Sequence, residues 1–153
     1  ITTDDRRTTV AANQRKDKDG QPAAAIELAD GTIITSEEST LLGPSAALIL
    51  NATKYLAGID HNLKLIPQEL IEPIQKTKTE YLGGNNPRLH TDEVLVALSV
   101  LSPHDPNCQK ALQHLPELRG CQAHCTVMLS EVDQKIFKKL GVGLTCDPVH
   151  KSR

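Results

Sequence analysis

The chain has 153 residues, of which 39% are hydrophobic and 24% charged, with a formal net charge of −2 and a pI near 6.3. This is the composition of a globular protein, and the length fits one domain whose core needs neither disulfides nor a structural metal. The charge excludes a strongly basic nucleic-acid scaffold and a polybasic membrane-surface binder. There is no apolar run near the ~20 residues of a membrane span and no signal-peptide pattern, so we expect a cytoplasmic protein without membrane partners.

Residues 1–22 are predicted to be a polar lead-in or linker, and residues 23–153 a single α/β domain. The lead-in carries a mixed run of charges, including Arg15 and Lys18, which is typical of a solvated loop. Only residues 8–12 would suit a short strand. Because the chain opens at Ile1 rather than at methionine, we interpret it as a piece joined to an upstream domain.

A β-hairpin is predicted next. The apolar and β-branched runs 23–28 and 32–35 flank Asp30-Gly31, a dipeptide that tolerates the positive φ angles of a tight turn.

Four helices should follow. The first begins at Pro44 and ends at Gly58, and it is apolar nearly all round, which indicates a central place in the core. The second runs from near Pro67 to Gly83-Gly84, and Pro73 either kinks it or marks its true start. Thr91 is predicted to cap the third. The fourth runs from Asp105-Pro106 to near Pro116.

The C-terminal segment predicts a strand, a helix and a second strand. Residues 123–129 and 142–146 are the strands, and the helix between them starts at a capping box formed by Ser130 and Asp133 and ends at Gly141. Short joints favour a parallel crossover unit. The predicted fold is therefore α/β, with a small mixed sheet (the hairpin plus a C-terminal βαβ unit) covered by about five helices.

The cysteines are sparse and irregularly spaced, and we expect all four to be reduced. Cys121 and His124 are weak candidates for metal binding. In a strand, Cys121 and Cys125 lie roughly 13 Å apart at about 3.3 Å per residue, whereas zinc needs its sulfurs within roughly 4 Å. We therefore predict no metal site, and a redox pair of Cys125 with Cys146 remains an alternative.

The densest polar cluster lies between the second and third helices. Its glycines, asparagines and proline indicate special loop geometry, and the loop delivers Arg88 and His90 to a helix N-terminus, where a phosphate or carboxylate binds well. The alternative is a plain connector in which Arg88 pairs with a local acid. Ser45, which follows Gly43-Pro44 at the start of an apolar helix, is a further candidate, although no P-loop or nucleophile-elbow pattern surrounds it. The predicted ligand-binding residues are Asn85, Asn86, Arg88, His90, Asp92 and Ser45.

Nucleic-acid binding is not expected. The third and fourth helices resemble a helix-turn-helix, but the second of them offers only Gln109, Lys110 and Gln113 in a mildly acidic domain.

Four ordered stretches, residues 26–35, 41–51, 86–95 and 118–124, resemble the C-terminal part of bacterial uncharacterised protein family 0371, which carries domain of unknown function 1846. The resemblance runs from about Ala23 to the C-terminus. It implies a longer cytoplasmic protein whose upstream region is a nucleotide-binding α/β domain. It brings no established activity, so it implies no catalytic residue. We expect no cofactor in this piece, while a nucleotide would belong to the full-length protein.

Two hypotheses of function follow. In the first, the domain contributes an anion or small-ligand subsite, built from Arg88, His90 and the adjacent helix start, to a nucleotide-linked protein. In the second, it is a structural domain that forms homo-oligomers and has no chemistry of its own. Zinc or redox chemistry ranks third, and the sequence leaves open whether the protein is an enzyme.

Overall fold

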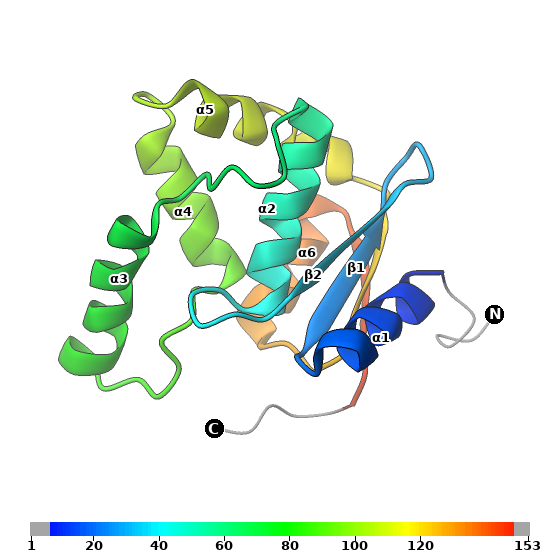
Figure 1. The fold of residues 1–153 in the computed structure, drawn as a ribbon, viewed down its shortest axis with the longest axis horizontal. Helices are drawn as coiled ribbons and strands as arrows, with labels where there is room; N and C mark the ends of the chain where they lie inside the picture. The colour runs from blue at the N-terminus through cyan, green and yellow to red at the C-terminus, as the bar shows by residue number, and fades with distance from the viewer. Residues whose placement is uncertain (1–6, 149–153) are drawn as a thin grey trace.

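The computed structural model describes residues 7–148, in which helices flank both faces of a four-stranded sheet (Figure 1). The strand order is β2-β1-β3-β4, from β1 (Ala23–Glu27), β2 (Ile33–Glu37), β3 (Gln122–Cys125) and β4 (Gly143–Cys146). β1 pairs antiparallel with β2 and with β3, and β3 pairs parallel with β4. The mixed sheet, its hairpin and its βαβ unit are thus confirmed.

The hairpin turn follows the predicted chemistry. Gly31 has φ +85°, a conformation that side chains with a Cβ rarely adopt, and its N–H donates to the carbonyl of Leu28. The Asp30 carboxylate accepts from the N–H of Thr32. The turn therefore fixes the register in which Ile26 faces Ile34.

The predicted solvated loop is wrong for residues 7–19, which form the helix α1 (Arg7–Asp19) against the sheet. Residues 1–6 of the predicted lead-in lie outside the described residues. Alternation along β1 turns Ala23 and Ala25 toward α1, and Ala12 of the helix is fully buried. These two alanines let small residues of α1 approach β1 closely, while Arg15 of the helix donates to Thr35 of β2. The sequence of α1 therefore lacks the large apolar stripe that usually marks a packed helix.

The remaining helices begin close to their predicted positions. They are α2 (Pro44–Ala57), α3 (Gln68–Lys76) with the π-helical turn η2 (Thr77–Tyr81), α4 (Thr91–Leu101), α5 (Pro106–Gln113) with the 3₁₀ turn η3 (Leu115–Leu118), and α6 (Glu131–Leu140). Gly58 ends α2 in the left-handed conformation, with φ +71°. Pro73 lies inside α3 and does not mark its start. β3 stops at Cys125, four residues short of the predicted end, because the chain then leaves the sheet to reach α6.

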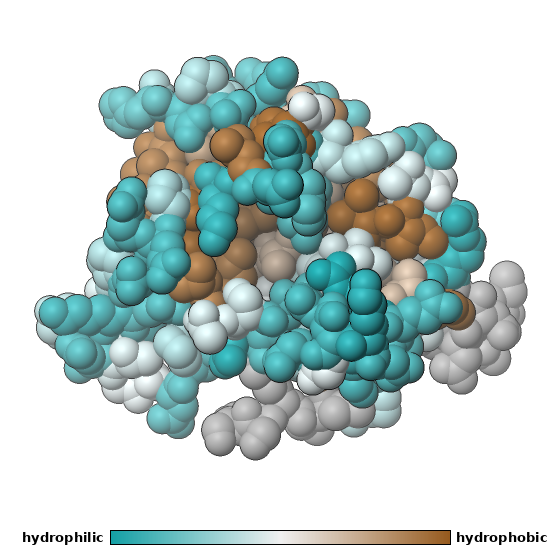
Figure 2. Space-filling model, in the orientation of Figure 1, coloured by the Kyte–Doolittle hydropathy of each residue, from teal (hydrophilic) through white to brown (hydrophobic). Residues whose placement is uncertain are grey.

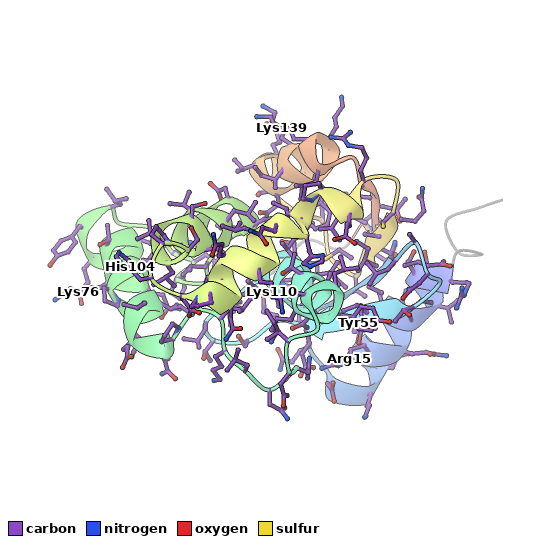
Figure 3. All side chains as sticks on the ribbon, turned by 90° about the horizontal axis from the view of Figure 1, so that it is seen from above. Arg15, Tyr55, Lys76, His104, Lys110 and Lys139 are labelled. Atoms are coloured by element: carbon purple, nitrogen blue, oxygen red, sulfur yellow. The ribbon has the colours of Figure 1, made fainter. Side chains whose placement is uncertain are left out.

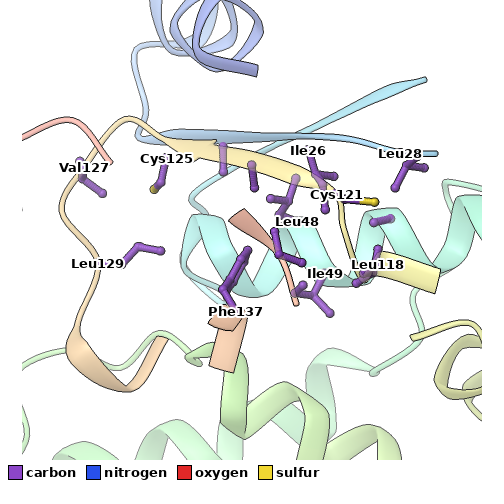
Figure 4. Packing of buried hydrophobic residues seen from close by; sticks show 14 residues of the cluster. Ile26, Leu28, Leu48, Ile49, Leu118, Cys121, Cys125, Val127, Leu129 and Phe137 are labelled. Atoms are coloured by element: carbon purple, nitrogen blue, oxygen red, sulfur yellow. The ribbon is translucent and has the colours of Figure 1, made fainter. Parts of the chain in front are cut away.

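The interior consists of two apolar clusters that share α2. In the first, Leu48 and Ile49 of α2 pack with Phe137 of α6 and Ile26 of β1 (Figure 4). The second lies between α2, α4 and α5 and includes Leu50, Leu89, Val94, Leu98 and Cys108. Contact on two sides explains why α2 is apolar nearly all round. Apolar surface is also visible between α3, α4 and the segment that joins α2 to α3 (Figure 2).

Charged side chains are spread over several elements. Arg15 lies on α1, Lys76 on α3, Lys110 on α5 and Lys139 on α6, at separate places in the view of Figure 3. No helix within residues 7–148 is both long and apolar enough to cross a bilayer.

Phe137 is the largest fully buried side chain among the described residues. It belongs to the apolar cluster that joins α6 to α2 and to the sheet. Replacing Phe137 with alanine should lower the free energy of unfolding by about 3–5 kcal/mol, because the lost apolar contact and the cavity left behind both destabilise the fold. Urea denaturation measures the loss. The matched control Tyr81→Ala removes an exposed aromatic ring and should change stability by less than about 0.5 kcal/mol. Equal losses in the two variants would contradict this description of the core.

Candidate functional site

A short parallel pairing brings the predicted loop to the start of α2. Leu42 and Leu89 form an isolated parallel bridge. The N–H of Leu89 donates to the Leu41 carbonyl at 3.0 Å, and the N–H of Gly43 donates to the Leu89 carbonyl at 3.2 Å. Two segments that are more than forty residues apart in sequence are therefore held side by side.

Three helices begin at the rim of one cavity. Gly43, Pro44 and Ser45 come from the start of α2, His90 from the start of α4, and Ser130, Glu131 and Asp133 from the start of α6. In Figure 1 these three helix starts lie together in the lower centre of the view. The cavity has a volume of ≈ 830 Å³, and Val127, Met128 and Leu129 form its apolar side. Helix N-termini carry partial positive charge, so three positive dipole ends meet at the wall of this cavity.

Five of the six predicted ligand-binding residues line this cavity. They are Asn85, Asn86, Arg88, His90 and Ser45. The sixth, Asp92, lies in the first turn of α4 and is not among the described residues that line it. The structure also adds Glu38 and Asp133, which the sequence did not single out as site residues.

Arg88 is anchored by its Nε atom. This atom donates to the Ser39 carbonyl at 2.6 Å and lies 3.7 Å from the buried Glu38 carboxylate. The backbone N–H of Arg88 donates to the side chain of Asn86, and its carbonyl accepts from the Lys78 ammonium group. The predicted pairing of Arg88 with a local acid is thus present. The ion pair is measured from Nε, the same atom that donates to the Ser39 carbonyl.

The Asp133 carboxylate connects α6 to α4. One oxygen lies 3.2 Å from His90 Nδ1, and the other accepts from the backbone N–H of Thr91 at 3.0 Å. Ser130 caps α6 as predicted, since its hydroxyl accepts from the N–H of Asp133. The prediction that Asp133 completes that capping box is wrong, because its carboxylate reaches α4 instead.

The prediction that Thr91 caps α4 is also wrong. His90 is the N-cap, and its backbone N–H donates to Glu93 at the third helical position. The Thr91 hydroxyl instead donates to the Ser45 hydroxyl at 3.1 Å, and both side chains are buried. Ser45 accepts this bond, so its own hydroxyl proton can be donated elsewhere.

The His90–Asp133 contact shifts the pKa of both groups. Burial alone would raise the pKa of Asp133, but the hydrogen bonds from His90 and Thr91 outweigh it and lower that pKa. The hydrogen bond to Asp133 raises the pKa of His90 against the opposing effect of burial. Both pKa shifts favour the form of the pair in which His90 is an imidazolium and Asp133 a carboxylate.

The start of α2 carries no side-chain cap. Gly43 has no side-chain oxygen, and Pro44 has no N–H. The next backbone N–H belongs to Ser45, which lines the cavity. An acceptor bound in the cavity would therefore meet donors from Ser45 as well as from Arg88 and His90.

The weak metal candidates do not come together. His124 is fully buried, and its two ring nitrogens contact Thr145 Oγ1 at 2.7 Å and Asp147 Oδ1 at 3.0 Å. Cys121 precedes β3, and its thiol contacts the Glu117 carbonyl. Within the described part of the chain, no three His, Cys, Asp or Glu side chains are gathered as a metal site would need.

All four cysteines are free thiols, as predicted. Cys125 and Cys146 are register partners on the parallel strands β3 and β4, which is the proximity that the redox alternative required. Burial raises the pKa of Cys125 to about 12 and also raises that of Cys146. Both therefore stay protonated at neutral pH, where the thiolate is the reactive form.

Comparison with known proteins gives the family. Residues 4–153 match the model described as "Domain of unknown function DUF1846, C-terminal". The chain belongs to this family. A "UPF0371 protein" of Corynebacterium aurimucosum is 54% identical over 149 residues, covering 97% of this chain and 30% of the relative. A "UPF0371 protein" of Streptococcus pyogenes is 46% identical over 151 residues, which cover 99% of this chain and 31% of the relative.

The chain thus spans about three-tenths of the length of these relatives. The resemblance inferred from the four sequence motifs is confirmed. Neither the family description nor the names of the relatives assign an activity.

Asp133→Asn should destabilise the domain by about 1–2 kcal/mol at pH 6, because the ionic hydrogen bond to His90 is lost; the partial exposure of His90 keeps the effect small. The raised pKa of His90 means that this stabilisation is full below about pH 6.5, its unfolded pKa, and is lost as pH rises through the folded pKa. The difference from wild type should therefore shrink by about pH 9. Denaturant unfolding at both pH values measures it.

Asp92→Asn serves as the control, because Asp92 is also an acid near the start of α4 but lies outside the cavity. Its effect should be the same at both pH values. A pH-independent loss in Asp133→Asn would show that the carboxylate acts only as a cap for Thr91.

Proposed function

We propose that this domain contributes a subsite for a small anionic ligand, or for the anionic part of a larger one, to the longer protein that its relatives represent. The ligand would bind to Arg88, His90 and Ser45 in the cavity at the starts of α2, α4 and α6. Nucleotides would be the leading class of larger ligand, because the resemblance noted in the sequence implies a nucleotide-binding region upstream.

The observation that carries this proposal is the convergence of donors on one cavity. Arg88 comes from the loop before α4, His90 from its N-cap, and Ser45 from the uncapped start of α2. Arginine suits carboxylate or phosphate through its paired Nη groups. The apolar side of the cavity gives room for a neutral part of the ligand beside its charge.

Thermal shifts with inorganic phosphate, nucleotides and amino acids test the proposal. A ligand at ten times its Kd should raise the Tm of the wild-type chain by about 3–6 °C, the rise expected from mass action for a domain of this size. Arg88→Ala should abolish that rise.

Lys110→Ala is the control. Lys110 is an exposed cation on α5, outside the cavity, so its loss should leave the shift unchanged. Equal shifts in Arg88→Ala and wild type across the whole panel would exclude the subsite, and equal loss in both variants would mark a non-specific charge effect.

A second candidate function is self-association. Val96 and Val100 lie one turn apart on α4, with exposures of 63% and 67%. Leucine, isoleucine and valine surfaces of this kind support homo-oligomers, although the chain has few of the aromatic residues that usually anchor interfaces.

Sedimentation of the wild-type chain over a range of concentrations tests this candidate. A dimer should dissociate on Val100→Glu, because a charge in an apolar contact is costly. A wild-type chain that stays monomeric at every concentration would exclude self-association of this domain.

A further inference from the structure

Charge at the cavity wall depends on one proton. Arg88 lies beside Glu38, and His90 lies beside Asp133, so both pairs are neutral while His90 is protonated. Glu131 adds a carboxylate at the exposed first position of α6. If His90 loses its proton, Asp133 becomes a negative charge with no other ion-pair partner among residues 7–148, and its side chain is only 4% exposed.

A buried carboxylate of this kind repels an anion strongly. Water screens it less than it screens an exposed carboxylate, so the repulsion of a like charge in the cavity is stronger. When the imidazolium of His90 neutralises the carboxylate, this repulsion of a bound anion is removed.

The other charged groups near His90 largely cancel. Glu93, on α4, accepts from the backbone N–H of His90 and is paired with Lys78 of η2 at 2.8 Å. Lys78 lowers the pKa of His90 and Glu93 raises it, and the hydrogen bond to Asp133 has a larger effect than either.

We propose that the cavity accepts its anion only while His90 carries a proton, so that His90 determines whether a negatively charged ligand can enter. This inference rests on the anion subsite proposed above and adds its regulation and ligand class. His90 Nδ1 is committed to Asp133, which leaves Nε2–H as the donor for the ligand. A tetrahedral oxyanion, such as sulfate or a phosphate monoester, has enough oxygens to accept from His90, Arg88 and Ser45 together.

The direction of the pH dependence follows from the contact with Asp133. That contact raises the pKa of His90, so the protonated form persists above the ordinary value of about 6.5. Anion affinity should be constant below the pKa and should fall about tenfold per pH unit above it, as linkage to one proton requires.

Sulfate is the probe that tests this inference, because its own charge does not change from about pH 5.5 to about pH 9, whereas phosphate titrates within that range. Sulfate also stabilises folded proteins by exclusion from their surface, so affinity should be measured by titration calorimetry or by NMR chemical shifts and not by Tm.

Three variants separate the roles. His90→Gln should bind sulfate weakly at all pH values, because Asp133 is then always uncompensated. Asp133→Asn should bind more tightly than wild type at about pH 9, because deprotonation of His90 then leaves no buried negative charge at position 133. His104→Gln, which removes an exposed histidine in the α4–α5 connection (Figure 3), should keep the wild-type profile. Circular dichroism checks that each variant is folded.

The outcomes distinguish the two proposals. No sulfate binding to the wild-type chain at any pH would overturn the subsite and this inference with it. Sulfate binding that is lost in Arg88→Ala but does not change with pH would support the subsite and overturn the role of His90. If His90→Gln keeps the wild-type pH profile of sulfate binding, the proposed role of His90 is overturned as well.

Discussion

The carboxylate of Asp133 ties the parts of the candidate site together. It sits at the start of α6, accepts from the first N–H of α4, and holds the ring of His90. Helix starts expose unsatisfied N–H groups, and two such ends would not normally be packed against each other without an acceptor between them. The shared carboxylate supplies that acceptor. It also fixes which nitrogen of His90 is left to face the cavity.

The position of α2 gives this arrangement its rigidity. Its two sides contact separate apolar clusters, one against the sheet and one against α4 and α5. Its N-terminus is therefore held in place by burial on both sides, and no side-chain cap is present there. A helix end that is well anchored and uncapped is suited to hold a ligand, since the binding groups need little ordering when the ligand arrives.

Most of the fold could be predicted from local chemistry. Asp30-Gly31, Pro44 with Gly58, and Ser130 with Gly141 are turn and cap residues whose effect depends on their immediate neighbours. The polar loop around Arg88 was recognisable for the same reason.

Features that depend on distant partners could not be predicted. Asp133 looked like a cap for its own helix, and nothing in the sequence indicates that its carboxylate reaches a helix more than forty residues earlier. The pairing of Arg88 with Glu38 is likewise a product of tertiary structure. α1 was not predicted because the apolar signal of a packed helix depends on what it packs against, and the part of β1 that it covers presents the small residues Ala23 and Ala25.

The sheet separates α1 from the layer that contains α2 and α6, and successive residues of β1 point to opposite sides of it. Ala25 faces α1, while its neighbour Ile26 faces α2 and α6 and, through them, the elements that build the cavity. A larger side chain at position 25 would push α1 outward without entering the layer that contains the cavity. The attachment of the N-terminal helix and the shape of the candidate site can thus be altered independently, although the residues that control them are adjacent in one strand.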